Sequence, residues 1–430
     1  MPERFQRQTR QETCHGPESA AAAGSSAISS YADGSIRPFH LHVPEGKLTD
    51  LRRRLESARW PDPETVDDQS QGVQLAKLQE LVNHWIYHYN WRALEARLNA
   101  LPQFMTEIDG LDVYFMHVRS PHPSALPMII THGWPGSPLE FLKVIEPLTN
   151  PIAHGGQAED AFDLVIPALP GFGFSGKPRE VGWGPDRVAH AWATLMKRLG
   201  YEQYVAQGGD WGATIAHRMA AQEAAGLCAI HVNLPQTVPS DVLVALHEGA
   251  PPLPGLSDEE RSAFHDIARF NHDNAGYVTI QRTRPQTLCY GLSDSPVGLA
   301  AWMYDKFAQW TDTGGEPERS LTKDEMLDGI TLYWLTESAA SSARIYWEKH
   351  NEHTSKPAEA TPFTAVSISV PAAVTVFNGE TYRAPLSWTQ RAYHKLIYFN
   401  RVSKGGHFAA WEVPDIFTKE LRAAFRSLRQ

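Results

Sequence analysis

Residues 207–212 of the chain are Gln207-Gly208-Gly209-Asp210-Trp211-Gly212. An apolar run, Tyr204-Val205-Ala206, precedes them, and a helix-like run from Ala213 to Ala220 follows. This order predicts a buried strand, a sharp turn rich in glycine, and then a helix. Strands that alternate with helices in this way are typical of an α/β sheet, so the stretch points to that fold class.

Asp210 has a small residue two positions before it and another two positions after it. This is the spacing of a turn that presents a nucleophile, with aspartate in the place that serine holds in esterases. A serine attacks an acyl carbon, whereas a carboxylate attacks a saturated carbon and becomes an ester. Aspartate is also a preferred helix N-cap, so Asp210 could simply begin the helix. The short motif alone does not decide between the two interpretations.

The remainder of the chain has the pattern of a doubly wound, mostly parallel sheet. An Asp109-Gly110 pair between alternating runs, residues 104–108 and 111–118, predicts a β-hairpin. Residues 39–43 alternate as a further short strand would. The expected strands of the main sheet are residues 128–131, 164–167, 204–206, 229–232, 373–377 and 396–399.

Five parts are expected along the chain. Residues 1–36 are rich in Ser, Ala, Gln and Gly and are expected to be a disordered tail. Residues 37–103 carry leucines at helical spacing and form an N-terminal helical segment. Residues 104–234 and 357–430 form the two parts of the α/β core. Between them, residues 235–356 read as a helical lid over the edge where such sheets bind ligands.

Composition limits the partners and the cellular setting. The chain has 430 residues, 42% of them hydrophobic, and a net charge of −10, which disfavours nucleic acid and anionic membranes as partners. Its three cysteines are too few for a disulfide framework or a cysteine-based zinc site, so we expect no metal. No apolar window approaches the roughly 18 residues of a membrane span, and no secretory signal begins the chain. A cytoplasmic location is expected.

A glycine-rich loop follows the strand at 128–131, with the sequence His132-Gly133-Trp134-Pro135-Gly136-Ser137. Its glycines let backbone approach a ligand closely, and Pro135 stiffens the turn. Beside a nucleophile such a loop supplies one oxyanion-binding N–H, here from Trp134, and the residue after the nucleophile, Trp211, supplies the other. The alternative is an ordinary strand-to-helix turn.

Two further side chains complete a candidate triad. His407 lies in a glycine-flanked turn between the last strand and the final helix, and Glu380 follows the strand that ends at Phe377. The chain order nucleophile, acid, histidine is that of enzymes built on this turn. Glu380 is the only carboxylate between Glu359 and Glu412 and would orient the imidazolium of His407. Taken singly, each could equally be a structural or solvated residue.

With these motifs in place, the chain resembles the microsomal-type epoxide hydrolases of the α/β-hydrolase superfamily from about Pro38 to Phe425. The stretch Ala58-Arg59-Trp60-Pro61 and a long lid stretch, residues 276–287 continuing through 293–302, carry the resemblance beyond the catalytic motifs. It implies an α/β-hydrolase fold and the conversion of an epoxide and water to a vicinal diol. The implied intermediate is an ester on Asp210, hydrolysed by water that His407 and Glu380 activate, without any cofactor.

The resemblance also implies two lid tyrosines that hydrogen-bond the epoxide oxygen. Tyr277 matches the first and Tyr346 the second, with Tyr333 as a nearby competitor for the second place. The chain departs from the microsomal enzyme because it lacks the N-terminal membrane anchor, so a soluble member is expected. A homodimer is compatible with the family.

Two other functions were weighed against this one. A haloalkane dehalogenase would use the same aspartate, histidine and loop, with Trp211 as a halide donor, but needs no paired lid tyrosines. A non-catalytic ligand-binding homologue would usually lack a triad member. The expected substrate is a small apolar epoxide, but the lid aromatics Trp302, Tyr304, Phe307 and Trp310 could line its pocket or belong to the core. Regioselectivity, enantioselectivity and biological role (detoxification, catabolism of aromatic hydrocarbons or natural-product biosynthesis) stay open.

Overall fold

The computed structural model describes residues 34–352 and 363–429. The predicted disordered tail comprises residues 1–36, and its residues 1–33 lie outside the described residues. Its last residues belong instead to the first strand, which begins at Ile36. The predicted division of the chain into a helical segment, two core parts and a lid stays a prediction, although the elements expected within those parts can be compared with the structure.

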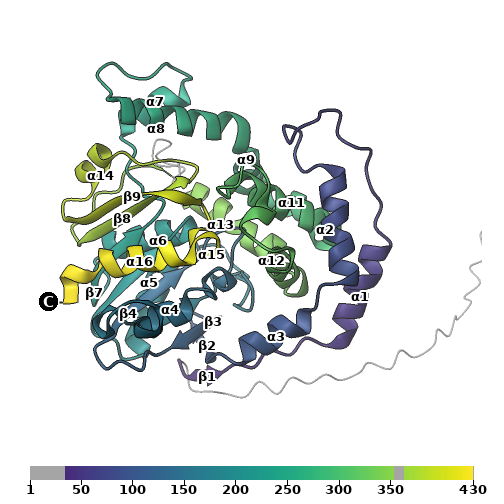
Figure 1. Cartoon of the computed structure of the whole chain (residues 1–430), viewed down its shortest axis with the longest axis horizontal. Coiled ribbons are helices and arrows are strands. Elements are labelled where there is room, and N and C mark those ends of the chain that lie inside the picture. The colour runs from purple at the N-terminus through teal and green to yellow at the C-terminus, as the bar shows by residue number, and fades with distance from the viewer. Residues whose placement is uncertain (1–33, 353–362, 430) are drawn as a thin grey trace, which may run out of the picture. The chain divides into compact units, whose positions relative to one another are not determined.

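The described part of the chain contains a nine-stranded sheet with the strand order β1-β2-β3-β5-β4-β6-β7-β8-β9 (Figure 1). The first three strands and the β3–β5 pair are antiparallel, and every pair from β5 to β9 is parallel. This confirms the expected mostly parallel sheet. The strands are β1 Ile36–Pro38, β2 Gln103–Ile108, β3 Leu111–Val118, β4 Leu126–Thr131, β5 Phe162–Pro167, β6 Tyr204–Gly208, β7 Leu227–Val232, β8 Ala372–Gly379 and β9 Leu396–Gly406.

The predicted hairpin is confirmed as β2 and β3. Asp109 and Gly110 both have positive φ, 51° and 77°, as a two-residue turn matched to the twist of its strands requires. The strand predicted at residues 39–43 is wrong. The strand in this region is β1, which ends at Pro38. The backbone N–H groups of Leu41 and Val43 donate to the side chains of Asn99 and Glu95 in helix α3 (Trp91–Asn99), instead of to a neighbouring strand.

Helices cover both faces of the sheet because strand residues alternate between two apolar clusters. Ile129 belongs to one cluster, whereas Met128 and Ile130 belong to the other. Helices α5 (Pro185–Arg198) and α6 (Trp211–Ala221) supply the first cluster, and α4 (Ile145–Thr149) and α16 (Pro414–Ala424) supply the second. The shorter helices α14 (Leu386–Ala392) and α15 (Ala409–Glu412) flank β9.

Strands β7 and β8 are neighbours in the sheet, although a long helical insertion separates them in sequence. Its helical character confirms the expectation for this stretch. The helices are α7 Ser240–His247, α8 Asp258–Arg269, α9 Gly276–Thr283, α10 Pro285–Asp294, α11 Pro296–Trp310, α12 Lys323–Leu335 and α13 Ala339–Glu352. A five-residue π-helical turn, Phe270–Asn274, links α8 to α9.

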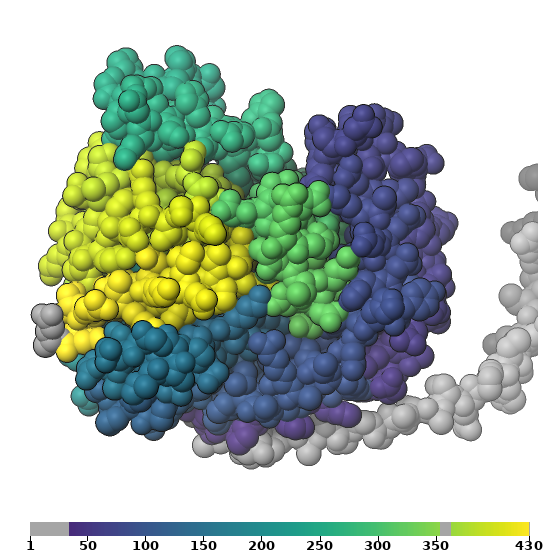
Figure 2. Space-filling model, viewed as in Figure 1, coloured from purple at the N-terminus to yellow at the C-terminus, as the bar shows by residue number. Residues whose placement is uncertain are grey.

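The N-terminal region contains the helices α1 (Glu45–Glu56), α2 (Leu75–Tyr87) and α3 (Trp91–Asn99), as the helical spacing of its leucines indicated. They pack on α11 and α12 of the insertion. Figure 2 shows the insertion, in green, between these N-terminal helices, in purple, and the C-terminal segment, in yellow. The contact includes a hydrogen bond from Tyr89 to Asp328 and an ion pair between Lys323 and Glu80, at 2.8 and 2.7 Å. Across the described residues, no helix is long and apolar enough to cross a bilayer.

Candidate active site

Asp210 lies in the turn between β6 and α6, with backbone angles φ 51° and ψ −124°. Positive φ is strained for a residue with a side chain, and such strain concentrates at functional sites. The turn closes only because its neighbours are glycines. A Cβ on Gly208 would lie 2.1 Å from Gly212, and one on Gly212 would lie 1.9 Å from the carbonyl oxygen of Thr131. The Asp210 side chain makes no capping hydrogen bond, so the structure gives no support to the N-cap interpretation.

The two carboxylate oxygens of Asp210 have different partners. Oδ1 accepts a hydrogen bond from the backbone N–H of Trp134 at 2.8 Å. Oδ2 lies 3.4 Å from Nε2 of His407. The carboxylate therefore faces a backbone donor on one side and a basic side chain on the other. Trp211, the next residue, begins α6, where backbone N–H groups have no carbonyl partner within the helix.

The glycine-rich loop after β4 approaches Asp210 closely. A Cβ on Gly133 would lie 2.3 Å from the Asp210 side chain, so only glycine fits there. His132 holds the loop from behind: Nδ1 is 2.8 Å from the carbonyl of Gly133, and Nε2 accepts from the N–H of Leu169. Burial lowers the pKa of His132 to about 4, in keeping with a neutral scaffold residue. The Trp134–Pro135 peptide bond is cis.

His407 and Glu380 meet directly. Nδ1 of His407 lies 2.8 Å from Oε1 of Glu380, which also accepts from the backbone N–H of Thr381 at 2.8 Å. The backbone N–H of His407 donates to the carbonyl of Trp310 on the insertion. Burial disfavours the imidazolium, but the carboxylates of Glu380 and Asp210 outweigh it and raise the pKa of His407 well above its usual value. The three predicted triad residues are thus brought together.

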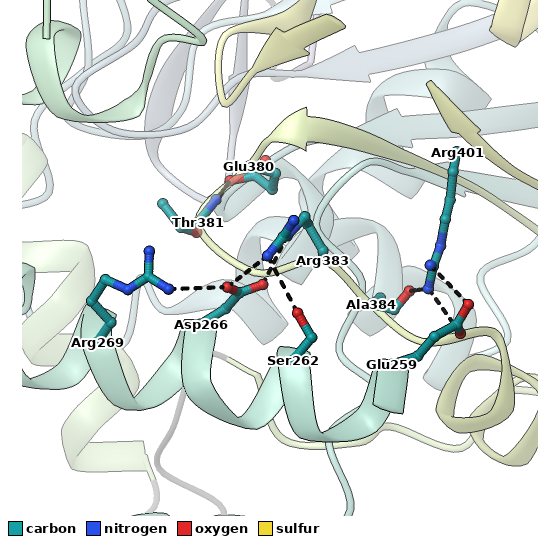
Figure 3. A network of polar contacts seen from close by, with 9 residues as sticks. All are labelled: Glu259, Ser262, Asp266, Arg269, Glu380, Thr381, Arg383, Ala384 and Arg401. Carbon is teal, nitrogen blue, oxygen red and sulfur yellow. Dashed lines mark hydrogen bonds and ion pairs between the residues drawn. The ribbon is translucent and has the colours of Figure 1, made fainter. Parts of the chain in front are cut away.

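A network of ion pairs holds the loop that carries Glu380 (Figure 3). Arg383 donates two hydrogen bonds to the buried carboxylate of Asp266 on α8, both at 2.9 Å. Arg269 reaches the same carboxylate at 3.7 Å. At the far end of α8, Glu259 pairs with Arg401 of β9. The loop that carries Glu380 is therefore joined to the insertion through Arg383, two residues beyond Thr381.

Replacing Arg383 by methionine should lower the free energy of unfolding by about 1–2 kcal/mol, because the buried carboxylate of Asp266 loses its bidentate partner. The midpoint and slope of urea unfolding would measure this. Arg401→Met is the matched control, since both partners of the Arg401–Glu259 pair are well exposed and its loss should cost only about 0–1 kcal/mol. Equal losses for the two variants would contradict the assignment.

A cavity of about 340 Å³ lies between Asp210 and the insertion. Tyr277 from α9 and Tyr346 from α13 line it together with Asp210, and their ring centroids are 5.8 Å apart. Tyr277 stacks on Trp134, and Tyr346 meets Trp211 edge-on. Burial raises the pKa of both phenols well above the usual value, so both stay protonated as hydrogen-bond donors. The Tyr346 hydroxyl is enclosed and makes no regular hydrogen bond.

Tyr333, the alternative to Tyr346 as the second lid tyrosine, makes a different contact. Its hydroxyl donates to the carbonyl of Gly136 in the glycine-rich loop at 2.8 Å. It does not line the cavity beside Asp210, whereas Tyr346 does. The four lid aromatics considered as pocket residues (Trp302, Tyr304, Phe307 and Trp310) do not line this cavity either. They pack instead within the core.

Lys306 on α11 is a further residue close to the candidate site, and the sequence motifs did not indicate it. Its ammonium lies 4.9 Å from the centroid of the Tyr277 ring and pairs with Asp305 at 2.6 Å, and the residue is buried. A cation over the face of an aromatic ring is attracted by the π-electrons of the ring. No sequence pattern indicated this contact, because a lysine on an amphipathic helix normally faces solvent.

Within the described ranges, no group of three or more His, Cys, Asp or Glu side chains could hold a metal ion. The arrangement supports nucleophilic chemistry: an uncapped carboxylate, a histidine–glutamate pair beside it and two phenols across the cavity from it. A carboxylate in this position can form an ester with a saturated carbon, and the neighbouring histidine can activate water to cleave it.

Comparison with known proteins gives matches over nearly the whole described chain. Residues 36–141 match the family model described as "Epoxide hydrolase N terminus", and residues 127–276 match that described as "alpha/beta hydrolase fold". A protein of Stigmatella aurantiaca, provisionally named an epoxide hydrolase, is 52% identical over 92% of this chain and 86% of its own length. "Epoxide hydrolase 1" of Sus scrofa is 33% identical over 96% of this chain and 92% of its own length.

A solved structure agrees with these sequence matches. The crystal structure of juvenile hormone epoxide hydrolase from the silkworm Bombyx mori superimposes with a TM-score of 0.82 at 31% identity. The alignment covers 93% of this chain and 96% of the silkworm chain. Both the sheet and the helical insertion therefore have counterparts in a solved structure.

Proposed function

Because the chain belongs to the epoxide hydrolase family of the α/β-hydrolase fold, we propose that Asp210, His407 and Glu380 carry out its reaction in two covalent steps. The chain is an epoxide hydrolase, which adds water to an epoxide to give a vicinal diol. The observation that carries the residue assignment is the position of Asp210, held in a strained turn with no capping bond and facing a cavity that two phenols also line.

In the first step Asp210 attacks an epoxide carbon. We assign the attack to Oδ2, because Oδ1 is held by the N–H of Trp134. A bond forms between Oδ2 and the carbon as the ring carbon–oxygen bond breaks. Tyr277 and Tyr346 hydrogen-bond the departing oxygen, and one of them gives it a proton. The products are a hydroxyalkyl ester on Asp210 and a tyrosinate, which regains its proton before the next turnover.

In the second step His407 takes a proton from water, and the hydroxide attacks Cγ of Asp210. The oxyanion forms on Oδ1, where the N–H groups of Trp134 and Trp211 stabilise it. The bond from Cγ to Oδ2 then breaks, and Oδ2 takes the proton from His407 as it leaves as a hydroxyl group of the diol. The new carboxyl group of Asp210 gives its proton to the tyrosinate, which restores the resting enzyme. Ester formation removes the negative charge of Asp210, so the pKa of His407 falls when a base is needed, while Glu380 still holds the ring.

The alternatives receive less support. Two phenols that line the Asp210 cavity suit a leaving oxygen, which must gain a proton, better than a halide, which need not. The apolar lining of the cavity, including Leu234, Leu246 and Phe270, favours a small apolar epoxide. A cytoplasmic location and a homodimer remain predictions from the sequence.

A single turnover in ¹⁸O-water tests the covalent route. With enzyme in excess over styrene oxide, the first diol should contain no solvent oxygen, and the label should appear in Asp210. Enzyme labelled in this way and returned to ordinary water should then pass ¹⁸O to the next diol. Solvent oxygen in the first diol would rule out an ester intermediate.

Tyr346→Phe should slow ester formation by about 10²–10³-fold, the usual effect of losing one donor to a developing oxyanion. Rapid-quench measurement of the ester at saturating styrene oxide would show it. Tyr333→Phe is the matched control: it removes the bond to Gly136 and should mainly lower stability, by about 1 kcal/mol. A larger kinetic effect at Tyr333 than at Tyr346 would reverse the assignment.

A further inference from the structure

A second, much smaller cavity adjoins Asp210. Its volume of about 20 Å³ is enough for one water molecule. Asp210 and His407 both line it, whereas Tyr277 and Tyr346 line only the larger cavity. The small cavity therefore adjoins the base and the nucleophile but not the two phenols.

Gln207 contributes an unusual group to this small cavity. It lies near the end of β6, three residues before Asp210, and is 1% exposed. Its Nε2 donates to Oδ1 of Asn233 at 3.1 Å, which fixes the orientation of the amide. Its Oε1 is enclosed and accepts no hydrogen bond. Buried carbonyl oxygens almost always have a partner, so an acceptor left open at a water-sized cavity calls for one.

Several other polar groups around the small cavity already have hydrogen-bond partners within the protein. Both ring nitrogens of His132 have backbone partners, and Oδ1 of Asn233 accepts from Gln207. Burial raises the pKa of Glu140 to about 8, and its Oε1 accepts from the N–H of Ser137. Among the described residues that line the small cavity, Gln207 is the one with a buried side-chain polar atom that has no hydrogen-bond partner.

We propose that the small cavity holds the water that hydrolyses the ester, and that Gln207 is the residue that positions it. The water donates one hydrogen to Nε2 of His407 and the other to Oε1 of Gln207, which leaves a lone pair directed at Cγ of Asp210. As His407 removes the first proton, the new bond forms between the water oxygen and Cγ. The inference rests on the proposed function and adds a residue that acts only on its second step.

Gln207→Met tests this directly, because methionine keeps the length of the side chain but cannot accept the hydrogen bond. Rapid-quench experiments with styrene oxide should show ester formation within about twofold of the wild-type rate and ester hydrolysis slowed by about 10–10²-fold. The pH at which the hydrolysis rate reaches half its maximum should stay the same, because no charge has been changed. Unchanged hydrolysis, or equal slowing of both steps, would overturn the proposal.

Gln103→Met is the matched control. Gln103 is also a buried glutamine in a strand, but it bonds Leu98 and Tyr114 far from Asp210 in sequence. It should lower stability and leave the ratio of the two rates unchanged. A shift of that ratio in this variant would mean that loss of any buried amide disturbs the second step, which would overturn the specific role of Gln207.

A crystal structure of the wild-type enzyme keeps the proposal testable if the Gln207 variant does not fold. It should show one ordered water within hydrogen-bond distance of both Gln207 Oε1 and His407 Nε2, and an empty cavity there would refute the proposal. The ¹⁸O experiment separates the two levels of inference. Label in Asp210 together with normal hydrolysis in Gln207→Met rejects only the role of Gln207, whereas no label in Asp210 rejects the ester mechanism itself.

Discussion

Asp210→Ala is expected to abolish diol formation, with a fall in kcat of about 10⁴–10⁶-fold, as when the nucleophile of a catalytic triad is removed. No ester can form on alanine, so intact-mass measurement after mixing with styrene oxide should show unmodified protein. The fold should persist, because the carboxylate makes no capping bond that α6 requires. Diol production at more than a trace rate by a correctly folded Asp210→Ala protein would contradict the assignment of the nucleophile.

Asp210→Asn extends this prediction to the electrostatics of the site. The Asp210 carboxylate helps to raise the pKa of His407, so its neutral replacement should lower that pKa. A raised histidine pKa stabilises the folded protein below the usual pKa, near 6.5, and this stabilisation disappears as the pH rises through the folded value. The variant should therefore lose part of its stability on the acid side. Histidine-selective NMR titration, with His407→Gln to assign the resonance, would measure the shift.

His407→Gln is expected to separate the two chemical steps. Ester formation needs the Asp210 carboxylate and the phenols, whereas hydrolysis needs a base for water, whose loss should slow that step by about 10²–10⁴-fold. The protein should therefore accumulate as an adduct heavier by the mass of one epoxide, located at Asp210 by peptide mapping. Glutamine keeps a polar side chain of similar reach, and its Nε2 can still donate a hydrogen bond to Glu380.

His231→Gln provides the control for His407→Gln. His231 is also fully buried and bonds Thr375 within the sheet, at 3.0 Å. Its replacement should cost stability without trapping any adduct. The assignment of the base fails if His407→Gln turns over at the wild-type rate, or if it cannot be alkylated at all while remaining folded.

The sequence predicted best the features that depend on local backbone geometry. The glycines around Asp210 indicated a sharp turn, and the Asp109-Gly110 pair indicated a hairpin. The structure has both turns, with positive φ at Asp210, Asp109 and Gly110. The Phe39–Val43 strand prediction is wrong because alternation alone does not reveal that Asn99 and Glu95 would satisfy Leu41 and Val43. The backbone N–H groups of this segment donate to side chains distant in sequence and not to the backbone of a neighbouring strand.

The residues of the candidate site also differ in how far the sequence could predict them. Asp210, His407 and Glu380 could be proposed from their places after strands, because those ends meet at one edge of the sheet. Tyr277 and Tyr346 needed the family resemblance, since tyrosines on a helical insertion are by default packing residues. Lys306 and Gln207 gave no signal, because their environments arise from contacts between elements that the sequence does not place together.

The two halves of the insertion are secured in different ways. Helices α11 and α12 pack on α1–α3, whereas α8 combines buried apolar residues such as Phe264 with the Arg383 and Arg401 ion pairs. The larger cavity is bounded by α7, α9 and α13, next to the second kind of attachment. Partly exposed ion pairs weaken as salt rises, whereas apolar packing does not. Raising the ionic strength should therefore weaken the Arg401–Glu259 pair between β9 and α8, but not the apolar packing of α11 and α12 on the N-terminal helices.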